Sequence, residues 1–482
     1  MDSDNGSASA RVRGVLPVPA VPAGGETPPG ASRRAAIVLL VSCLGVFVVF
    51  LDTTIVNIAF PTISRDLGSA AGRSAWILNA YSLVFAAMLI PAGSLADRYG
   101  RKRMFLAGLV GFAAMSALCG AAPGIWALIA GRALQAVFAA LIVPASLALM
   151  LPAFPPARRP VAVGTWGAMG AAAAAVAPTL GALLTEYASW RWIFLVNVPV
   201  CVLVIIACAR FTEESRGGRG QGIPDPFGGV LIAVIPAALS LAIIEGPGWG
   251  WTDGRVLAGF AVAAVLLPVL LRRCRTAAVP VLDLTLFRVP RFTAVNAATF
   301  LFAVAFYATL LGNVIFLQQV WHYSVLRSAL ANVPGPLAVL IVARRSSKLA
   351  VKVGYRRVLT VGALLWAAGS VLFAISTSAT PHFLADWLAP TVLIGLGAAL
   401  TLPVQSATAA QSLPPARFGT GSAVNSSLRQ LGAVLGVSVL VAVTASTAGT
   451  SALTAFHHAW WAFAAIGLAA GAVPYALPAR NS

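Results

Sequence analysis

Charged residues are scarce in this sequence. Only 10% of its 482 residues are charged and 59% are hydrophobic, whereas a typical soluble domain is about 25% charged. A soluble protein of this length needs more polar side chains than that to cover its surface. The long apolar stretches must therefore face lipid, which predicts an all-α membrane protein.

Several signals of other protein classes are missing. The five cysteines lack Cys-x-x-Cys or Cys/His spacing, so we expect no metal site. No GxxxxGK[ST] phosphate loop occurs, which disfavours ATP-driven pumping by this chain alone. No nucleophile–base pair falls within the apolar stretches, so we expect neither an enzyme nor a cofactor. The net charge is +19, but no basic face with interleaved aromatics forms, which argues against a nucleic-acid partner.

The N-terminal segment also lacks a long apolar run. Residues 1–34 are rich in proline, glycine, serine and alanine, and they lack the apolar region and cleavage site of a signal peptide. We expect this segment to be a disordered tail.

Fourteen apolar stretches are long enough to cross a bilayer as helices, which takes about 20 residues each. They cover residues 35–60, 74–96, 104–122, 125–150, 161–185, 191–210, 226–245, 255–271, 292–319, 327–343, 358–376, 385–409, 418–443 and 458–478. With the N-terminus inside, 26 of the 33 Lys and Arg residues fall on the inner side and 5 on the outer side. This split follows the positive-inside rule and predicts that both termini are cytoplasmic.

The densest charge cluster lies in the turn GSLADRYGRKRM, residues 93–104. A related segment, SKLAVKVGYRR at residues 347–357, aligns with it so that Gly354 matches Gly100 and Ala350 matches Ala96. Transporters often consist of repeated halves. We therefore expect spans 1–6 and 9–14 to form two halves, with spans 7 and 8 inserted between them.

Other short motifs accompany this turn in a fixed order. They are LDTTIVNIAFP (51–61), WILNAY (76–81), WRWIFLVNVP (190–199) and SSLRQLGAVLG (426–436). Together they resemble the fourteen-span drug:proton antiporter branch of the major facilitator superfamily. The resemblance implies the major facilitator fold, with two six-helix bundles and two inserted helices. The expected parts are a cytoplasmic tail (1–34), an N-terminal bundle (35–210), the inserted helices with their loops (211–290), a C-terminal bundle (291–478) and a cytoplasmic tail (479–482).

The resemblance also implies a function. It implies a proton-coupled antiporter in the plasma membrane that exports drugs, antibiotics or other amphipathic small molecules. Its expected partners are the substrate, protons and lipid, and we expect a monomer. Two glycines of the branch's span-5 motif are replaced by Ala177 and Ala182, so a proton-coupled importer or symporter of a small metabolite stays an alternative. A non-transporting membrane sensor or scaffold is a further alternative.

Asp52 and Arg132 are ionisable residues inside predicted spans. A carboxylate in the membrane interior is costly unless it is protonated or paired, and arginine does not deprotonate. We expect Asp52 to exchange a proton during transport, which the resemblance also implies, and Arg132 to sense its charge. The alternatives are a helix cap near the outer interface for Asp52 and a static ion pair or carbonyl clamp for Arg132.

The turn after span 2 combines Gly93, Asp97, Arg98, Gly100 and Arg101. The positive-inside rule does not explain the acid. We interpret the cluster as a conformational latch, a charge-assisted network that joins the two halves at the inner surface. Gly93 would allow close helix approach, and Gly100 a turn with positive φ. The alternative is a solvated cluster that only sets topology.

Two further groups of candidates lie within the spans. The resemblance places an antiporter motif on span 5, where Gly167, Gly170, Pro178 and Gly181 would permit a kink and tight packing against the other half. Polar and aromatic residues elsewhere are candidates for the substrate cavity, because aromatics supply contact area with little directional demand. They are Asn57, Trp76, Asn79, Tyr81, Gln135, Trp166, Phe306, Tyr307, Asn313, Gln405, Asn425 and Arg429. Packing or interfacial positions are the alternative for most of them.

Overall fold

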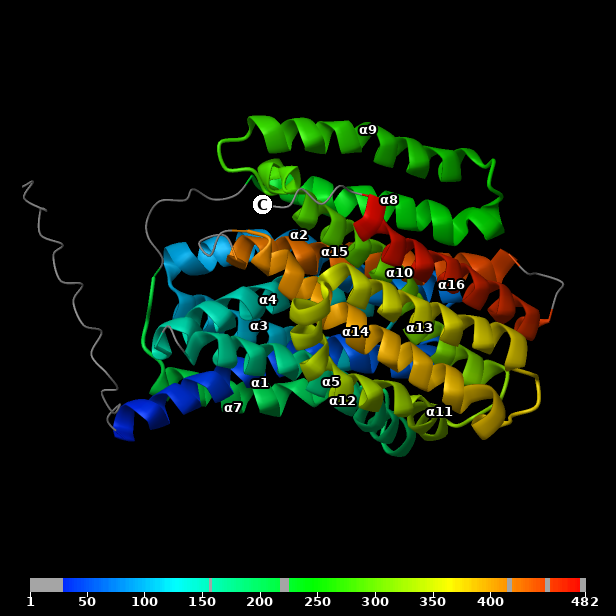
Figure 1. Cartoon of the computed structure of the whole chain (residues 1–482). Helices are drawn as coiled ribbons and strands as arrows, with labels where there is room; N and C mark the ends of the chain where they lie inside the picture. Colours follow the sequence, from blue (N-terminus) through cyan, green and yellow to red (C-terminus); the bar gives the residue numbers. More distant parts are fainter. Residues whose placement is uncertain (1–28, 156–157, 217–224, 414–417, 447–450, 477–482) are drawn as a thin grey trace, which may run out of the picture.

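The computed structural model describes residues 29–155, 158–216, 225–413, 418–446 and 451–476, and all regular elements within them are helical (Figure 1). Residues 1–28 of the expected N-terminal tail and the expected tail 479–482 lie outside these ranges. The first helix begins at Pro29. Residues 29–34, expected in the tail, therefore belong to the helix.

The long helices follow the apolar stretches of the sequence. They are α1 (Pro29–Asp66), α2 (Ala71–Tyr99), α3 (Arg101–Gly120), α4 (Ile125–Met150), α5 (Arg159–Tyr187), α6 (Trp192–Leu195), α7 (Asn197–Phe211), α8 (Pro226–Trp249), α9 (Gly254–Thr276), α10 (Pro290–Gln319), α11 (Val325–Asn332), α12 (Pro334–Val353), α13 (Tyr355–Ser376), α14 (Ala389–Gln411), α15 (Phe418–Ser446) and α16 (Ala452–Ala476). Short 3₁₀ turns lie at η1 (Leu151–Ala153) and η3 (Leu284–Arg288), and a π turn lies at η4 (Phe383–Leu388).

Among the described residues, twelve helices are long and apolar enough to cross a membrane. A pair within α2, Gly72–Leu89 and Pro91–Tyr99, is bent by 50° and brings the number to thirteen if the pair is one span. Pro91 explains the bend because proline removes a backbone donor and clashes with the preceding turn. The expected span 161–185 falls on α5, several side chains of which lie outside the described set. The number fourteen therefore stays a prediction.

The helices pack as two groups with a hairpin between them in the sequence. In the first group α1 packs on α5, and α4 on α2 and α3; in the second, α10 packs on α15 and α16, and α13 on α14 and α16. The groups meet where α2 packs on α15 and α5 on α11 and α12. Helix α8 packs on both α2 and α15, and α9 lies outside α8 along one edge of the bundle (Figure 1). We call α1–α7 the N-terminal half and α10–α16 the C-terminal half.

The α2–α3 and α12–α13 turns share one geometry. Gly100 has φ 115° and ψ 132°, and Gly354 has φ 91° and ψ 138°. Their backbone N–H groups donate to the carbonyls of Ala96 and Ala350. Glycine suits both positions because side chains disfavour positive φ. The common geometry supports the internal repeat.

The two ends of the bundle differ in their turns. The end with the α2–α3 turn, residues 97–103, is called the basic end below. The opposite end, with the α1–α2 turn at residues 67–70, is called the cavity end because a large cavity opens there.

Candidate functional site

Asp52 lies inside the N-terminal half with no exposed surface. Its Oδ2 pairs with Nη1 of Arg132, whose side chain is 1% exposed. Its Oδ1 accepts from Nε2 of Gln135 at 3.0 Å and from Nδ2 of Asn197 at 2.9 Å. Both carboxylate oxygens are therefore satisfied, so burial of this charge is compensated by a cation and two amides.

The guanidinium of Arg132 is fixed from several sides. It lies over the Tyr81 ring at 4.0 Å from the ring centre and at 5.7 Å from that of Phe194. It also donates to Oε1 of Gln135 at 2.6 Å and to the carbonyl of Ile77 at 3.4 Å. Cation–π contacts strengthen when the groups are desolvated. Tyr81 and Gln135, expected in a substrate cavity, thus also belong to this cluster.

Two members of the cluster were assigned no role by sequence reasoning. Ser116 on α3 accepts from Nε2 of Gln135 at 2.7 Å and from Asn197 at 3.3 Å. Asn197 begins α7 within the motif WRWIFLVNVP. Each is a polar residue within an apolar span, and this feature of the sequence could have marked both as candidates. The cluster therefore joins α1, α2, α3, α4 and α7.

A small cavity separates this cluster from the C-terminal half. Its volume is about 20 Å³, and its lining includes Arg132, Tyr81 and Asn57 on one side and Tyr307, Ala433 and Val437 on the other. A space of this size holds about one water molecule. Thr53, Ser82 and the buried Tyr81 also line it, so polar side chains face this space.

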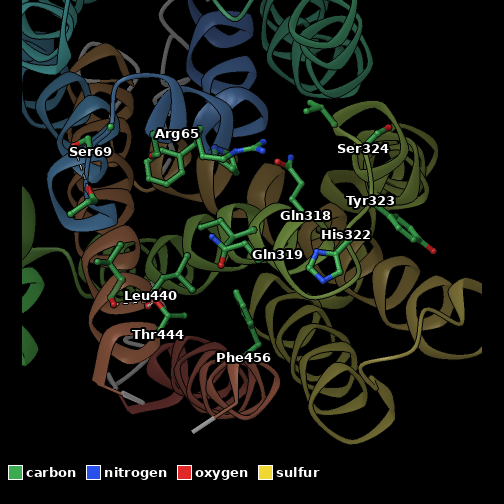
Figure 2. A pocket seen from close by; sticks show the side chains of 18 of the residues that line it. Arg65, Ser69, Gln318, Gln319, His322, Tyr323, Ser324, Leu440, Thr444 and Phe456 are labelled. Carbon is green, nitrogen blue, oxygen red and sulfur yellow. Dashed lines mark hydrogen bonds between the residues drawn. The ribbon is translucent and has the colours of Figure 1, made fainter. Parts of the chain in front are cut away.

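A larger cavity of about 1110 Å³ opens at the cavity end, between α1, α10, α15 and α16. The Ser64 hydroxyl and both amide atoms of Gln318 line it and have no hydrogen-bond partner among the described residues. Figure 2 shows the side chains of Arg65 and Gln318 pointing toward one another. His322, also on the lining, has φ 52° and is the non-glycine residue with positive φ in the described part of the chain. The lining thus carries polar groups ready for a ligand or water.

One face of α1 connects the two cavities. Thr53 and Asn57 line the small cavity, and Phe60, Pro61 and Ser64 line the large one. These positions recur every three or four residues, so they share one side of the helix. A continuous stripe of α1 therefore runs from the ion-pair cluster to the cavity end.

The C-terminal half contains a second polar cluster around Asn425. Its Nδ2 donates to Oδ1 of Asn296 at 3.1 Å and to Oγ1 of Thr299 at 2.9 Å. Its Oδ1 accepts from Nη2 of Arg429 at 3.0 Å, and the same nitrogen donates to Oγ of Ser406 at 2.6 Å. Asn425 and Arg429 are therefore brought together by the fold.

The remaining cavity candidates are dispersed. Trp166 donates to Ser146 at 3.0 Å within the N-terminal half, and Asn313 accepts from Trp460 at 3.1 Å within the C-terminal half. Asn79 of α2 instead crosses the interface and donates to Ser438 of α15 at 3.2 Å. Of the others, Trp76 and Phe306 are half-buried, Tyr307 lines the small cavity, and Gln405 is buried. Packing within one half thus explains Trp166 and Asn313.

The charged turn at the basic end makes its contacts inside the N-terminal half. Oδ1 of Asp97 accepts from Nε and Nη2 of Arg101 at 3.0 and 2.8 Å, and Nη1 of Arg101 donates to the carbonyl of Ala148 on α4 at 3.3 Å. Arg98 lies 5.6 Å from the Tyr99 ring. The network described here joins α2, α3 and α4. These contacts do not reach the C-terminal half, so the latch between the halves stays a prediction.

Glu214, which sequence reasoning did not single out, completes this network. Its carboxylate accepts from the backbone N–H groups of Lys102 at 3.0 Å and Arg103 at 3.1 Å. An acid suits this place because the first N–H groups of a helix lack intrahelical partners. The Lys102 ammonium donates in return to the carbonyls of Ala209 and Thr212. The segment after α7 is thus fastened to the start of α3.

The small residues expected to allow close helix packing are those of the α5 motif and Gly93. A Cβ on Gly181 would lie 2.6 Å from Ile55 of α1, and one on Gly170 would lie 3.5 Å from Phe50 of α1. Gly181 and Gly170 therefore pack on α1 in their own half, whereas Ala182 of the same helix lies with Val314 and Ala329 of the C-terminal half. The expected tight packing of the motif against the other half stays a prediction. Pro178 is buried within α5, and Gly167 is exposed with nothing near its Cβ position. A Cβ on Gly93 would meet Pro144 at an ordinary 3.7 Å, so close approach does not require glycine there.

Comparison with known proteins identifies the family. The model of the Major Facilitator Superfamily matches residues 42–437. The chain belongs to this superfamily. It is therefore a multi-pass membrane transporter rather than an enzyme.

Known superfamily members resemble the chain over most of its length. The multidrug resistance protein Stp of Mycobacterium tuberculosis (strain CDC 1551 / Oshkosh) is 34% identical over 86% of this chain and 77% of its own. The tetracenomycin C resistance and export protein of Streptomyces glaucescens is 34% identical over 87% of this chain and 78% of its own.

Solved structures agree with the fold. An auto-inhibited peptide transporter of the POT family matches with a TM-score of 0.69 at 16% identity, over 93% of this chain and 97% of that one. A bacterial homologue of the lysosomal transporter Spinster matches with a TM-score of 0.62 at 15% identity, over 94% and 97% of the two chains. These similarities confirm the major facilitator fold.

Proposed function

We propose that this superfamily member exports drugs, antibiotics or other amphipathic small molecules across the plasma membrane in exchange for protons. The names of its relatives support drug export. The observation that carries the proton step is the fully buried Asp52–Arg132 pair beside a cavity between the halves. The basic end is cytoplasmic in this proposal, as are both termini, and the protein acts as a monomer.

The chemistry of the pair suits proton exchange. Asp52 is an acid and Arg132 stays charged, so the pair has one titrating member. Protonation of Asp52 would remove its attraction to the guanidinium, which keeps its contacts with Tyr81 and Gln135. Helix α1 would then lose its strongest contact with α4. Because α1 also lines both cavities, loss of this contact would loosen the helix at the interface about which the two halves move.

In this proposal protons reach the pair from the cavity end. On one face of α1, Ser64 lines the large cavity and Asn57 and Thr53 line the small one. Water in the small cavity would lie against Arg132 and Tyr81. Inward movement of one proton releases about 1.4 kcal/mol per pH unit, which supports about a tenfold substrate gradient per unit.

The test compares wild-type chain with Asp52→Asn in everted membrane vesicles whose lumen is acidified by respiration. We expect the wild type to accumulate an uncharged amphipathic drug probe and to release luminal protons when the probe is added. We expect Asp52→Asn to lose both signals while its amount in the membrane, measured by immunoblot, is unchanged.

The control is Asp66→Asn, at the far end of α1, where the acid pairs with Arg191 and Trp190 instead. This variant should keep proton-coupled accumulation. Accumulation by Asp52→Asn at the wild-type rate would contradict the proposed proton site. Alkalinisation of the lumen while probe leaves it, with protons and probe moving in the same direction, would favour the import alternative.

A further inference from the structure

Arg429 is a cation without an acidic partner. Its two described hydrogen bonds, to Ser406 and Asn425, both use Nη2. Nε is buried and has no partner. No carboxylate within the described residues forms an ion pair with it, and the acids outside those residues, Asp2, Asp4 and Glu26, all precede α1.

The contrast with the N-terminal half is direct. There the buried cation Arg132 is neutralised by Asp52. A charge within a membrane is expensive, so ionisable residues there usually pair with one another or mark a substrate path. The C-terminal half thus holds a positive charge that the described residues do not neutralise.

Arg429 lies on the side of α15 whose other residues line the two cavities, and it lines neither cavity itself. Ala433 and Val437 line the small cavity, and Leu440 and Thr444 line the large one. Arg429 continues this series one turn toward the basic end, at the same three- and four-residue spacing. Its side chain therefore starts from the stripe along which a substrate would pass.

The neighbours of Arg429 hold its guanidinium in place without neutralising its charge. Asn425 uses both amide hydrogens on Asn296 and Thr299, so its oxygen must face Arg429. The acceptors around the guanidinium are neutral, and the single N–H of Nε has no acceptor among the described residues. An anionic oxygen is the acceptor that would bind most strongly, because hydrogen bonds between ionised groups are roughly twice as strong as neutral ones.

We propose that Arg429 binds an acidic group of the substrate, so that the preferred substrates are amphipathic molecules with a carboxylate or phenolate. This inference rests on the proposed export function and names its substrate class. Cationic molecules of the same size would be disfavoured by the unpaired positive charge.

The experiment uses two xanthene dyes of similar size and opposite charge, fluorescein and rhodamine 123. Their protonophore-sensitive accumulation in everted vesicles is measured by rapid filtration for the full-length chain and its variants. We expect wild type to prefer fluorescein. Arg429→Gln should lower the fluorescein-to-rhodamine ratio at least tenfold, and Arg429→Lys should retain part of the preference because the charge remains.

Controls separate a binding role from a structural one. Arg345→Gln removes an exposed cation on α12 and should leave the dye ratio unchanged. Rhodamine accumulation by Arg429→Gln, at or above the wild-type level, shows that the variant is folded and coupled.

The outcomes distinguish the two proposals. Equal dye ratios in wild type and Arg429→Gln, or a wild-type preference for rhodamine 123, would overturn the role of Arg429 while leaving export intact. Failure of wild type to accumulate either dye would overturn the export function and this inference together.

Discussion

The buried Asp52–Arg132 pair makes a prediction about stability that is independent of transport. Arg132→Met leaves a carboxylate with no exposed surface beside two amides, and it removes a cation from the Tyr81 ring at 4.0 Å. Breaking a buried pair by removing one member costs about 3–5 kcal/mol. Loss of the ring contact adds about 0.5–2 kcal/mol. We therefore expect Arg132→Met to destabilise the protein by about 4–6 kcal/mol.

The complementary change and the double variant complete a thermodynamic cycle. Asp52→Asn leaves Arg132 uncompensated and should cost about 3–5 kcal/mol. The double variant Asp52→Asn/Arg132→Met buries no charge, and neutral replacements of a buried pair are often close to neutral in stability. Its loss should therefore be much smaller than the sum of the two single losses, with a coupling free energy of about 3 kcal/mol or more.

The assay is thermal and denaturant unfolding of the purified variants in detergent, followed by tryptophan fluorescence. Arg191→Gln, which affects an exposed pair with Asp66, is the control and should change stability by less than about 1 kcal/mol. Additive losses in the double variant would refute the reasoning, because they would show that the two side chains stabilise the fold independently.

Two further predictions concern other parts of the fold. Hydrogen bonds from Arg273 at 2.6 and 2.9 Å hold the pKa of Asp225, the N-cap of α8, below its usual value of 3.8. Asp225→Asn should therefore lower the unfolding temperature at pH 5–8. The difference from wild type should begin to shrink as the pH falls through 3.8 and should disappear only below the lowered pKa of the folded protein, where the native carboxylate takes up a proton. Gly436→Ala places a Cβ against the Val304 carbonyl and should destabilise the α10–α15 contact by about 1–3 kcal/mol. The control Gly167→Ala meets nothing within 4 Å and should stabilise α5 by about 0.5–1 kcal/mol in the same unfolding assay. Equal effects of the two substitutions on stability would contradict the described packing.

The sequence predicted features that follow from the chemistry of a single residue type. A charge in an apolar span must find a partner, so Asp52 and Arg132 could be selected before either was located. A glycine repeated at matching turns predicts a common backbone geometry, and Gly100 and Gly354 have it. Superfamily membership and the helical fold followed from motif order and composition.

The sequence was less informative where the outcome depends on which helix lies nearest. Arg101 could have reached the other half, but the α4 carbonyl of Ala148 lies closer. Gly181 could have packed on either half, and it meets Ile55 of α1. Glu214 belongs to the network only because α7 ends beside the start of α3. Such choices are made by tertiary packing, which helical periodicity does not encode.

The lone guanidinium of α15 has a consequence for electrical driving force. An exchange of one inward proton for one outward neutral molecule moves a single charge, worth about 2.3 kcal/mol per 100 mV. If the outgoing molecule is a monoanion, as Arg429 favours, the same exchange moves two charges in the direction that a negative interior promotes. Voltage then contributes about 4.6 kcal/mol per 100 mV, about two-thousandfold in gradient rather than about fiftyfold. Such a pump would keep working when the pH on the two sides is equal.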